Sequence, residues 1–137
     1  MYNFEYASIN DFTYLRSCDT HIANELLERK IKNKEVIIVE NNNRIIGWLR
    51  YGYFWDDIPF MNLLMIDEQF RGKGIGKSLV KFWEEDMKKM GHEIVMTSTL
   101  SDESAQHFYR KLKYRDAGSL LLEDEALEII FTKKIIL

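Results

Sequence analysis

The stretch FMNLLMIDEQFRGKGIGKSLVKFWEEDMKKMG, residues 60–91, decides the fold. Its first seven residues, 60–66, are almost continuously apolar, which is typical of a strand buried on both faces at the centre of a sheet. The apolar residues of 75–90 recur on one helical stripe, and Gly91 is a natural residue to end that helix. A further strand is expected at 93–99. The order strand, helix, strand predicts a right-handed crossover between two parallel strands.

Antiparallel strands are predicted before and after this crossover. The predicted strands are 3–9, 35–40, 44–54, 60–66, 93–99, 114–122 and 127–135, and the predicted helices are 19–33, 75–90 and 102–112. The resulting order is β-α-β-β-β-α-β-α-β-β. It predicts an α/β fold in which residues 1–137 form a single domain. Its mixed sheet has antiparallel N- and C-terminal parts around a central parallel strand pair.

Composition and charge exclude several classes of protein. The 137 residues are 46% hydrophobic and 13% aromatic, which is enough for a real core and argues against disorder. The net charge of −3 argues against a nucleic-acid binder. Cys18 is the only cysteine, and the three histidines match no zinc spacing, so we expect no metal site. No apolar run is long enough to span a membrane and the N-terminus has no signal core, so we expect a cytoplasmic protein.

The segment Arg71-Gly72-Lys73-Gly74-Ile75-Gly76-Lys77 joins the buried strand to the long helix. Glycine has no Cβ, so the backbone can bend sharply and an anion can approach its N–H groups closely. The helix begins at the same point, and its unpaired N–H groups and positive dipole end favour negative charge. Arg71, Lys73 and Lys77 add positive charge to this turn. The segment is therefore predicted to bind phosphate or pyrophosphate.

Two common phosphate-binding motifs do not match this segment. A Walker A loop could end at Gly76-Lys77-Ser78, but its first glycine would fall at Arg71. A dinucleotide fingerprint would need a third glycine where Lys77 stands, early in a doubly wound fold. A nucleotide-phosphate-binding module is therefore the weaker alternative.

The pattern Arg-x-x-Gly-x-Gly of Arg71, Gly74 and Gly76 resembles that of the GCN5-related N-acetyltransferase (GNAT) superfamily. Members of that family often carry a second motif, Asn-x-x-Ala-x-x-Phe-Tyr-x-x-x-Gly-Phe/Tyr, about 30 residues further on. This chain matches it at Ala105, Phe108, Tyr109 and Tyr114. Asp102 replaces the usual Asn, and Lys113 replaces the usual Gly. Because Lys tolerates positive φ less well than Gly, we expect the helix to end slightly differently here.

The resemblance implies that acetyl-coenzyme A is the cofactor. In the family the glycine-rich loop holds the pyrophosphate, and the preceding strand pairs with the pantetheine arm through backbone groups. The implied cofactor-binding residues are Leu64, Met65, Ile66, Arg71, Gly72, Lys73, Gly74, Ile75, Gly76, Lys77, Asp102 and Tyr109. A backbone N–H at Leu64 or Met65 would polarise the acetyl carbonyl.

The resemblance also implies direct acetyl transfer in a ternary complex. Tyr109 would be the general acid that protonates the leaving thiolate. Glu68 is our candidate for the base that takes the proton of the amine. Asp67, Asp56, Asp57 and a chain of waters are the alternatives.

The acceptor is expected to be a primary amine of a small molecule or peptide. Trp55, Asp56 and Asp57 could form an aromatic and acidic pocket for a cationic amine. The protein would be a monomer or a homodimer, with no nucleic-acid or membrane partner. The alternative function is a non-catalytic acyl-CoA-binding or sensing domain of the same fold.

Overall fold

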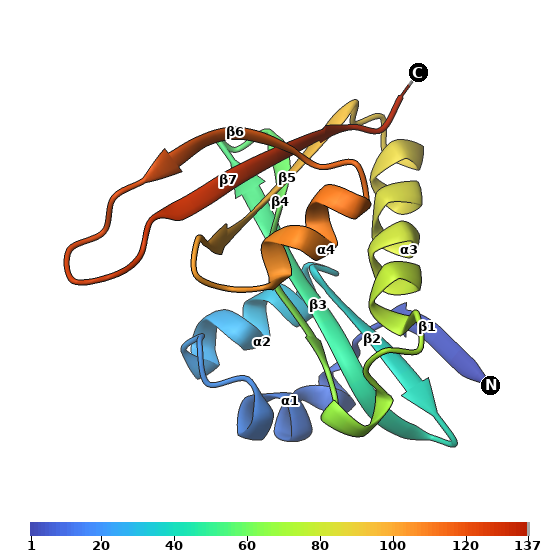
Figure 1. Ribbon diagram of the computed structural model, residues 1–137. Helices are drawn as coiled ribbons and strands as arrows, with labels where there is room; N and C mark the ends of the chain where they lie inside the picture. The colour runs from blue at the N-terminus through green and yellow to red at the C-terminus, as the bar shows by residue number, and fades with distance from the viewer. Residues whose placement is uncertain (137) are drawn as a thin grey trace. The chain divides into compact units, whose positions relative to one another are not determined.

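The computed structural model describes residues 1–136 of the chain, which contain seven strands, four α-helices and two 3-10 turns (Figure 1). In chain order these are β1 (Tyr2–Tyr6), η1 (Ile9–Asp11), α1 (Phe12–Cys18), α2 (Asn24–Lys32), β2 (Val36–Asn41), β3 (Arg44–Phe54), β4 (Ile58–Ile66), η2 (Glu68–Phe70), α3 (Ile75–Lys89), β5 (Ile94–Leu100), α4 (Ala105–Lys111), β6 (Arg115–Leu120) and β7 (Glu128–Lys134). None of the helices in this part of the chain is long and apolar enough to cross a membrane.

The strands form a mixed sheet in the order β1-β2-β3-β4-β5-β7-β6. The pairs β1–β2, β2–β3, β5–β7 and β7–β6 are antiparallel, whereas β4 and β5 are parallel. This confirms the predicted α/β class and the parallel pair on either side of the crossover. The residues divide into two compact units, 1–51 with 63–82 and 52–62 with the chain from Trp83 onward.

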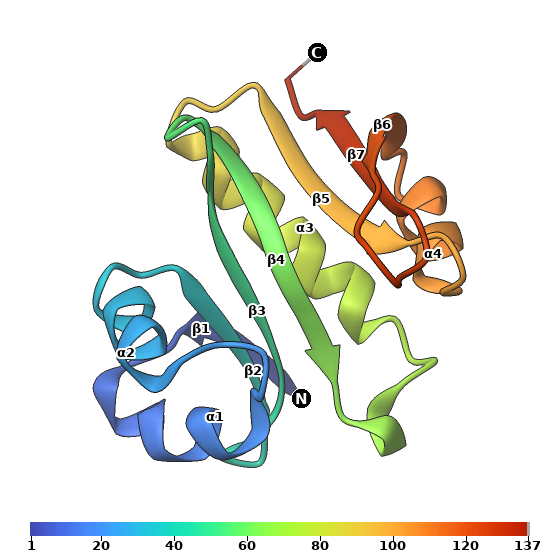
Figure 2. The ribbon, with the colours of Figure 1, turned by 90° about the vertical axis from the view of Figure 1, so that its left-hand side faces the viewer.

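In the first unit, α1 and α2 pack against one face of β1, β2 and β3 (Figure 2). The buried residues of this core are Ala7, Leu15, Leu27, Ile31, Val36, Ile38, Ile45 and Trp48. Successive strand residues point to opposite faces, so Phe4 and Tyr6 lie on the other face together with Val39 and Ile37. There both rings contact Phe82 of α3, at centroid distances of 5.9 and 6.5 Å.

A buried ion pair fixes the segment between α1 and α2 to β3. Asp19 Oδ2 accepts hydrogen bonds from Arg50 Nε at 2.8 Å and from Trp48 Nε1 at 3.3 Å. Arg50 Nη2 donates to Asp19 Oδ1 at 3.3 Å, and the two charged side chains are 0% and 7% exposed. The sequence predicted one helix at 19–33, but Asp19 is extended and ends α1 so that its carboxylate reaches Arg50. The order of elements therefore contains one more helix than predicted.

In the second unit, α4 and the last turns of α3 pack on the same face of β5 and β7 (Figure 1). The Tyr109 ring of α4 lies 6.1 Å from Phe131 of β7. Glu84 of α3 is buried and accepts hydrogen bonds from Tyr114 at 2.7 Å and from Lys133 at 3.0 Å. Burial and the adjacent Glu84 carboxylate hold the pKa of Tyr114 well above its usual value.

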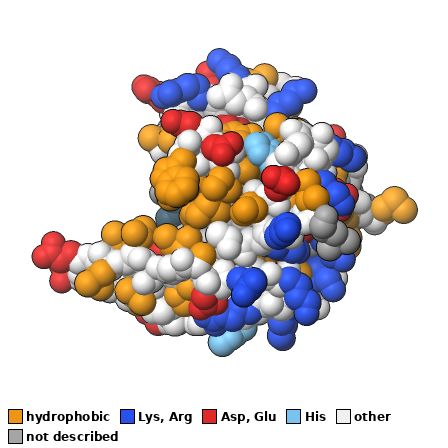
Figure 3. Space-filling view, turned by 90° about the horizontal axis from the view of Figure 1, so that it is seen from above, with side chains coloured by type: hydrophobic (Ala, Val, Ile, Leu, Met, Phe, Trp, Pro, Cys, Tyr) orange, Lys and Arg blue, Asp and Glu red, His pale blue; other side chains and the backbone are white. Residues whose placement is uncertain are grey.

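The arm formed by β6 and β7 presents apolar side chains to solvent. All six residues of β6 are exposed. Exposed leucines continue beyond it, and the arm at the left of Figure 3 ends in acidic side chains. The exposed leucines are Leu120, Leu121, Leu122 and Leu127, and the acidic residues of the tip are Glu123, Asp124 and Glu125.

Residues in the left-handed conformation form two hairpin turns of the sheet. Asn42 and Asn43 have φ of 53° and 62°, a conformation that asparagine tolerates, and form the tight turn between β2 and β3. Trp55 and Asp56 also have positive φ, 58° and 56°. Residues 54–57 therefore form a tight hairpin turn, closed by Asp57 N donating to Phe54 O at 3.1 Å. The strand β4 begins at Ile58, two residues earlier than predicted.

Lys113 follows α4 in the left-handed conformation, with φ of 75°. The expectation of a different helix exit was wrong, because this lysine adopts the conformation that a glycine would adopt there. We expect Lys113→Gly to raise the free energy of unfolding by about 1 kcal/mol, since glycine has no Cβ to strain in this region. Urea unfolding measures the change.

Lys111→Gly is the matched control for this substitution. Lys111 is the last residue of α4, where glycine should instead lower stability by up to about 1 kcal/mol. A loss of stability in both variants would contradict the strain at Lys113.

Candidate active site

The glycine-rich segment of the first unit forms an open loop between β4 and α3 (Figure 2). Gly72 and Gly74 have φ of +76° and +81°, a conformation that side chains rarely adopt. A Cβ placed at either position would meet nothing within 4 Å. The two glycines are therefore required by the backbone conformation, and the space beside them is free to hold a ligand.

The N-terminus of α3 presents hydrogen-bond donors at this loop. The first bond of the helical pattern runs from Ser78 N to Gly74 O, at 3.1 Å. The N–H groups of Ile75, Gly76 and Lys77 precede that bond and so have no partner within the helix. The 15-residue helix adds its positive dipole end at the same place. This arrangement can bind an anion.

The basic residues of the loop have different roles. Arg71 Nε donates to Ile66 O at 2.8 Å, and Arg71 Nη2 contacts Met65 Sδ at 3.7 Å, so this side chain ties the loop to the end of β4. Lys73 is exposed and lies over the Phe70 ring at 5.4 Å. Lys77 is also exposed, whereas the predicted cofactor residue Ile75 is 3% exposed and offers only its backbone.

The predicted cofactor strand lies close to β3. A Cβ on Gly47 would be only 2.7 Å from Met65 O, and Asp67 N donates to Ile46 O at 2.8 Å. Gly47 is therefore required by the close approach of the two strands. Met65 packs against the core under α1 and α2, whereas Leu64, its neighbour, points to the opposite face.

Glu68, the predicted base, lies directly after β4. It begins the 3-10 turn η2 and is exposed, and it lines a shallow depression with Asp67 and Gln69. Asp67 forms an exposed ion pair with Arg44 at 3.5 Å. The structure thus places Glu68, Leu64, Met65, Ile66 and residues 71–77 in consecutive segments of the first unit.

Tyr109, the predicted general acid, belongs to the second unit and is 7% exposed. Burial raises its pKa to about 12; a hydrogen bond with Thr97 lowers the pKa, and the charge of Glu103 raises it. Thr97, itself 1% exposed, donates to Met61 O at 2.9 Å. Tyr109 is thus a buried phenol that stays protonated at neutral pH.

Asp102 lies in the exposed turn before α4. The adjacent Gln106, which the sequence analysis did not single out, holds this turn: its Nε2 donates to Ser101 O at 2.8 Å and to Glu103 O at 2.9 Å. The turn that leads to Tyr109 is therefore fixed by a side-chain amide.

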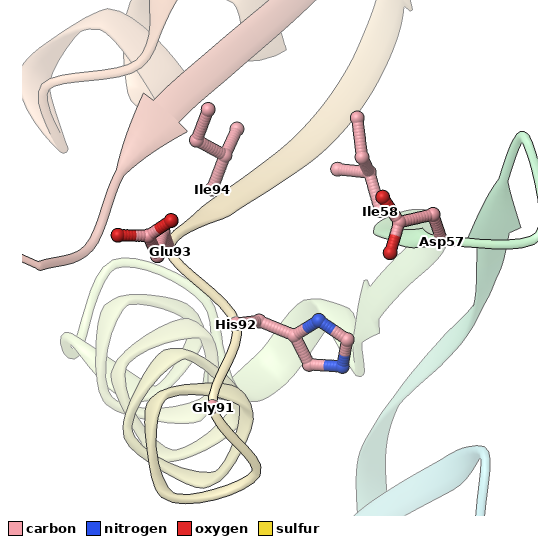
Figure 4. A pocket seen from close by; sticks show the side chains of 6 residues that line it. All are labelled: Asp57, Ile58, Gly91, His92, Glu93 and Ile94. Atoms are coloured by element: carbon pink, nitrogen blue, oxygen red, sulfur yellow. The ribbon is translucent and has the colours of Figure 1, made fainter.

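The predicted acceptor residues lie at the tip of the β3–β4 turn. Trp55 is 79% exposed, and its ring lies 4.7 Å from that of Phe54. Asp57 lines an open depression of about 250 Å³ with His92 and Glu93 (Figure 4). Among residues 1–136, no group of three or more His, Cys, Asp or Glu side chains could hold a metal ion.

The buried polar residues were missed by the sequence analysis: Asp19, Arg50, Glu84, Thr97 and Thr99. Glu84 and Asp19 are buried carboxylates whose partners come from distant strands, and no local pattern marks them. Thr97 could have been noticed, because Val95, Thr97 and Thr99 form a β-branched series on one face of the strand.

Comparison with known proteins identifies the family. The model of the acetyltransferase (GNAT) family matches residues 4–114, which include the loop after β4 and the whole of α4. The chain therefore belongs to the GNAT acetyltransferase family. No curated protein sequence matches it.

Solved structures of similar fold include several acetyltransferases. A GNAT family acetyltransferase from Bacillus cereus is 24% identical, with a TM-score of 0.79 over 98% of this chain and 97% of that one. The ribosomal-protein-S18-alanine N-acetyltransferase from Escherichia coli is 12% identical, with a TM-score of 0.80 over 100% and 96%. A putative streptothricin acetyltransferase from Bacillus anthracis, in complex with acetyl coenzyme A, is 20% identical, with a TM-score of 0.67 over 72% and 61%. At these identities the likeness shows the fold.

Proposed function

We propose that this protein is an acetyl-CoA-dependent N-acetyltransferase that transfers an acetyl group to a primary amine of a small molecule or peptide. The observation that carries the proposal is the open loop of Gly72 and Gly74 at the N-terminus of α3. Two left-handed glycines, unpaired helical N–H groups and exposed lysines form a binding site for a pyrophosphate. The family and the neighbour that contains acetyl coenzyme A support this choice of ligand.

In this proposal residues 1–137 act as one N-acetyltransferase domain, and the cofactor contacts three segments. The pyrophosphate binds to the loop of residues 71–77, where the N–H groups of α3 begin. The pantetheine arm pairs with the backbone of Leu64, Met65 and Ile66. Asp102 and Tyr109 lie near the thioester end. The family supports the assembly of these segments around one cofactor, since its model spans all of them.

The reaction is a direct transfer in which atoms and charges balance. The lone pair of a neutral amine attacks the acetyl carbon, and the carbonyl electron pair moves to oxygen, where a backbone N–H of Leu64 or Met65 stabilises the charge. When the carbonyl re-forms, the C–S bond breaks and its electron pair leaves on sulfur. Tyr109 gives its proton to that sulfur, and the nitrogen loses a proton to a base, for which we propose Glu68.

The β3–β4 turn is our candidate for contact with the acceptor. Trp55 is exposed at its tip, and Asp56 and Asp57 supply negative charge beside it. An aromatic face next to carboxylates favours a cation, which is the form of a free amine at neutral pH. The leucines exposed at the end of β6 and in the turn after it could meet a second copy of the chain, so we propose a monomer or a homodimer.

Release of free thiol from acetyl-CoA in the presence of a panel of amines tests the proposal. Polyamines, amino acids, aminoglycosides and peptides with free N-termini cover the acceptor classes. We expect thiol release that depends on one class of amine. Tight binding of acetyl-CoA without turnover on any amine would instead favour the alternative, a non-catalytic acyl-CoA-binding domain of the same fold.

A further inference from the structure

We propose that Tyr114 is a positioning residue for Tyr109, and that the buried carboxylate of Glu84 holds Tyr114 in place for this role. All three residues belong to the second unit. The inference rests on the proposed function, because it concerns the general acid of that reaction. Its structural part, the fixed position of the Tyr109 ring, can be tested without activity.

The end of α4 joins the backbone of Tyr114 to that of Tyr109. Tyr114 N donates to Tyr109 O at 3.0 Å. Lys113, which is left-handed with φ of 75°, donates its N–H to Arg110 O, also at 3.0 Å. These two bonds around one left-handed residue form a Schellman motif, the common way of ending a helix. The chain therefore turns back at Lys113 and brings Tyr114 to the helical turn that carries Tyr109.

The two tyrosine rings meet at this turn. Their centroids lie 5.7 Å apart and their planes form an angle of 69°, which is an edge-to-face contact. An apolar contact between these two positions often accompanies the Schellman motif. Tyr114 is 2% exposed and Tyr109 is 7% exposed. Because a buried, close-packed ring has little free space around it, a shift of the Tyr114 ring would move the Tyr109 ring as well.

A buried carboxylate holds the other end of Tyr114. The Tyr114 hydroxyl donates to Glu84 Oε2 at 2.7 Å, and Glu84 is 8% exposed. Lys133 Nζ donates to Glu84 Oε1 at 3.0 Å and lies 5.4 Å from the centre of the Tyr114 ring. A hydrogen bond to a charged group is stronger than one between neutral groups. Tyr114 is therefore fixed at its hydroxyl to α3 and, through Lys133, to β7.

Stability alone gives little reason to bury these charges. The cost of removing Glu84 and Lys133 from water offsets most of their attraction, and a phenylalanine in place of Tyr114 would fill the core without needing either charge. The hydrogen bond to Glu84 adds what phenylalanine lacks, which is a single fixed orientation of the ring. We infer that this orientation serves Tyr109, the ring that Tyr114 contacts edge to face.

The position of the Tyr109 ring matters because a general acid must hold its proton within hydrogen-bond reach of the leaving sulfur. A displacement of about 1 Å at a reacting group can cost up to about 100-fold in rate. Loss of the Tyr114 hydroxyl loosens the ring of Tyr109 but leaves the acid in place. We therefore expect it to lower kcat about 10-fold, less than removal of the acid itself.

Steady-state thiol release compares Tyr114→Phe with Tyr51→Phe, the matched control. Tyr51 is also 2% exposed, and its hydroxyl donates to Lys34 O at 3.3 Å in the first unit. We expect Tyr114→Phe to lower kcat about 10-fold, with KM for acetyl-CoA within about twofold of wild type. Tyr51→Phe should keep kcat within about twofold. Equal kcat in the two variants would overturn the inference.

Glu84→Gln and Glu84→Met separate the hydrogen bond from the packing, and they do so even if Tyr114→Phe does not fold. Both new side chains have nearly the length of glutamate, but only glutamine keeps an oxygen that accepts from Tyr114. We expect Glu84→Met to lower kcat about 10-fold and Glu84→Gln to stay within about threefold. Equal losses in these two variants would contradict the role of Glu84.

A double variant tests whether Tyr114 acts through Tyr109. Once Tyr109→Phe has removed the acid, nothing remains for Tyr114 to position, so adding Tyr114→Phe should lower kcat no further. A residue that supports only the fold would lower kcat by the same factor in both backgrounds. That additive result would overturn the inference.

The ring resonances of Tyr109 follow its position without any need for activity. They are observed in protein labelled with ¹³C-tyrosine and assigned with Tyr109→Phe. We expect Tyr114→Phe and Glu84→Met to shift them and Tyr51→Phe to leave them in place. If wild type transfers no acetyl group, the proposed function fails, while these resonances still decide whether Tyr114 and Glu84 fix the ring. Unshifted Tyr109 resonances in Tyr114→Phe would overturn the inference.

Discussion

Replacement of Tyr109 by Phe is expected to lower kcat about 100-fold, at the lower end of the range for loss of a general acid. The affinity for acetyl-CoA should change by less than twofold. Phenylalanine keeps the ring that packs against Phe131 and Tyr114, and removes only the hydroxyl. Without that hydroxyl, the thiolate leaves without a proton from the enzyme.

The raised pKa of Tyr109 predicts the pH dependence of this effect. An acid acts only while it is protonated, and burial moves the pKa of this phenol from 10.0 to about 12. Wild-type kcat should therefore show no loss from ionisation of Tyr109 up to about pH 10, where a free phenol would be half ionised.

Steady-state thiol release from pH 6 to 10, with calorimetric titration of acetyl-CoA, measures both quantities. Tyr2→Phe, at an exposed tyrosine of β1, is the control and should match wild type. A Tyr109→Phe enzyme with unaltered kcat would remove Tyr109 from the mechanism.

Replacement of Asp19 by Ala is expected to lower the free energy of unfolding by about 3–5 kcal/mol. The substitution leaves the Arg50 guanidinium buried at 7% exposure without its carboxylate partner, and it removes the acceptor of Trp48 Nε1. The segment between α1 and α2 would also lose its bond to β3. Equilibrium unfolding in urea measures the change.

Glu28→Ala is the control for this prediction. Glu28 pairs with Lys32 one turn away on α2, at 3.1 Å, and both side chains are well exposed. Loss of such a pair should cost less than about 0.5 kcal/mol. If Asp19→Ala were no more destabilising than Glu28→Ala, the buried ion pair would not hold the first unit together.

Much of the fold could be predicted because its strands have simple patterns. The apolar run of residues 60–66 indicated a buried strand, and the stripe of residues 75–90 indicated the helix after it. α1 was missed because Leu15 is its only buried residue, so its seven residues show no apolar period. The sequence likewise gave no sign that Asp19 ends α1, since its partner Arg50 is 31 residues away.

The candidate site could be predicted only where its geometry is local. The conformation of Gly72 and Gly74 and the start of α3 follow from neighbouring residues, and both are as expected. The Tyr109 ring of α4 packs against Phe131 of β7, so no local pattern contains its surroundings. The left-handed Lys113 shows the reverse case, in which packing imposes a conformation that the residue disfavours.

Calorimetric titration of acetyl-CoA into wild-type protein and Gly74→Asp tests the central claim, that the loop after β4 binds the pyrophosphate. Gly74 has a φ of +81°, which an aspartate could adopt only with strain. The carboxylate would also add negative charge where the phosphates would lie. Gly91→Asp is the matched control, since Gly91 is left-handed at +95° and also has nothing within 4 Å of a Cβ. We predict that wild type and Gly91→Asp bind with equal affinity and that Gly74→Asp binds at least about 10-fold more weakly. Equal affinity in all three proteins, or no binding by wild type, would contradict it.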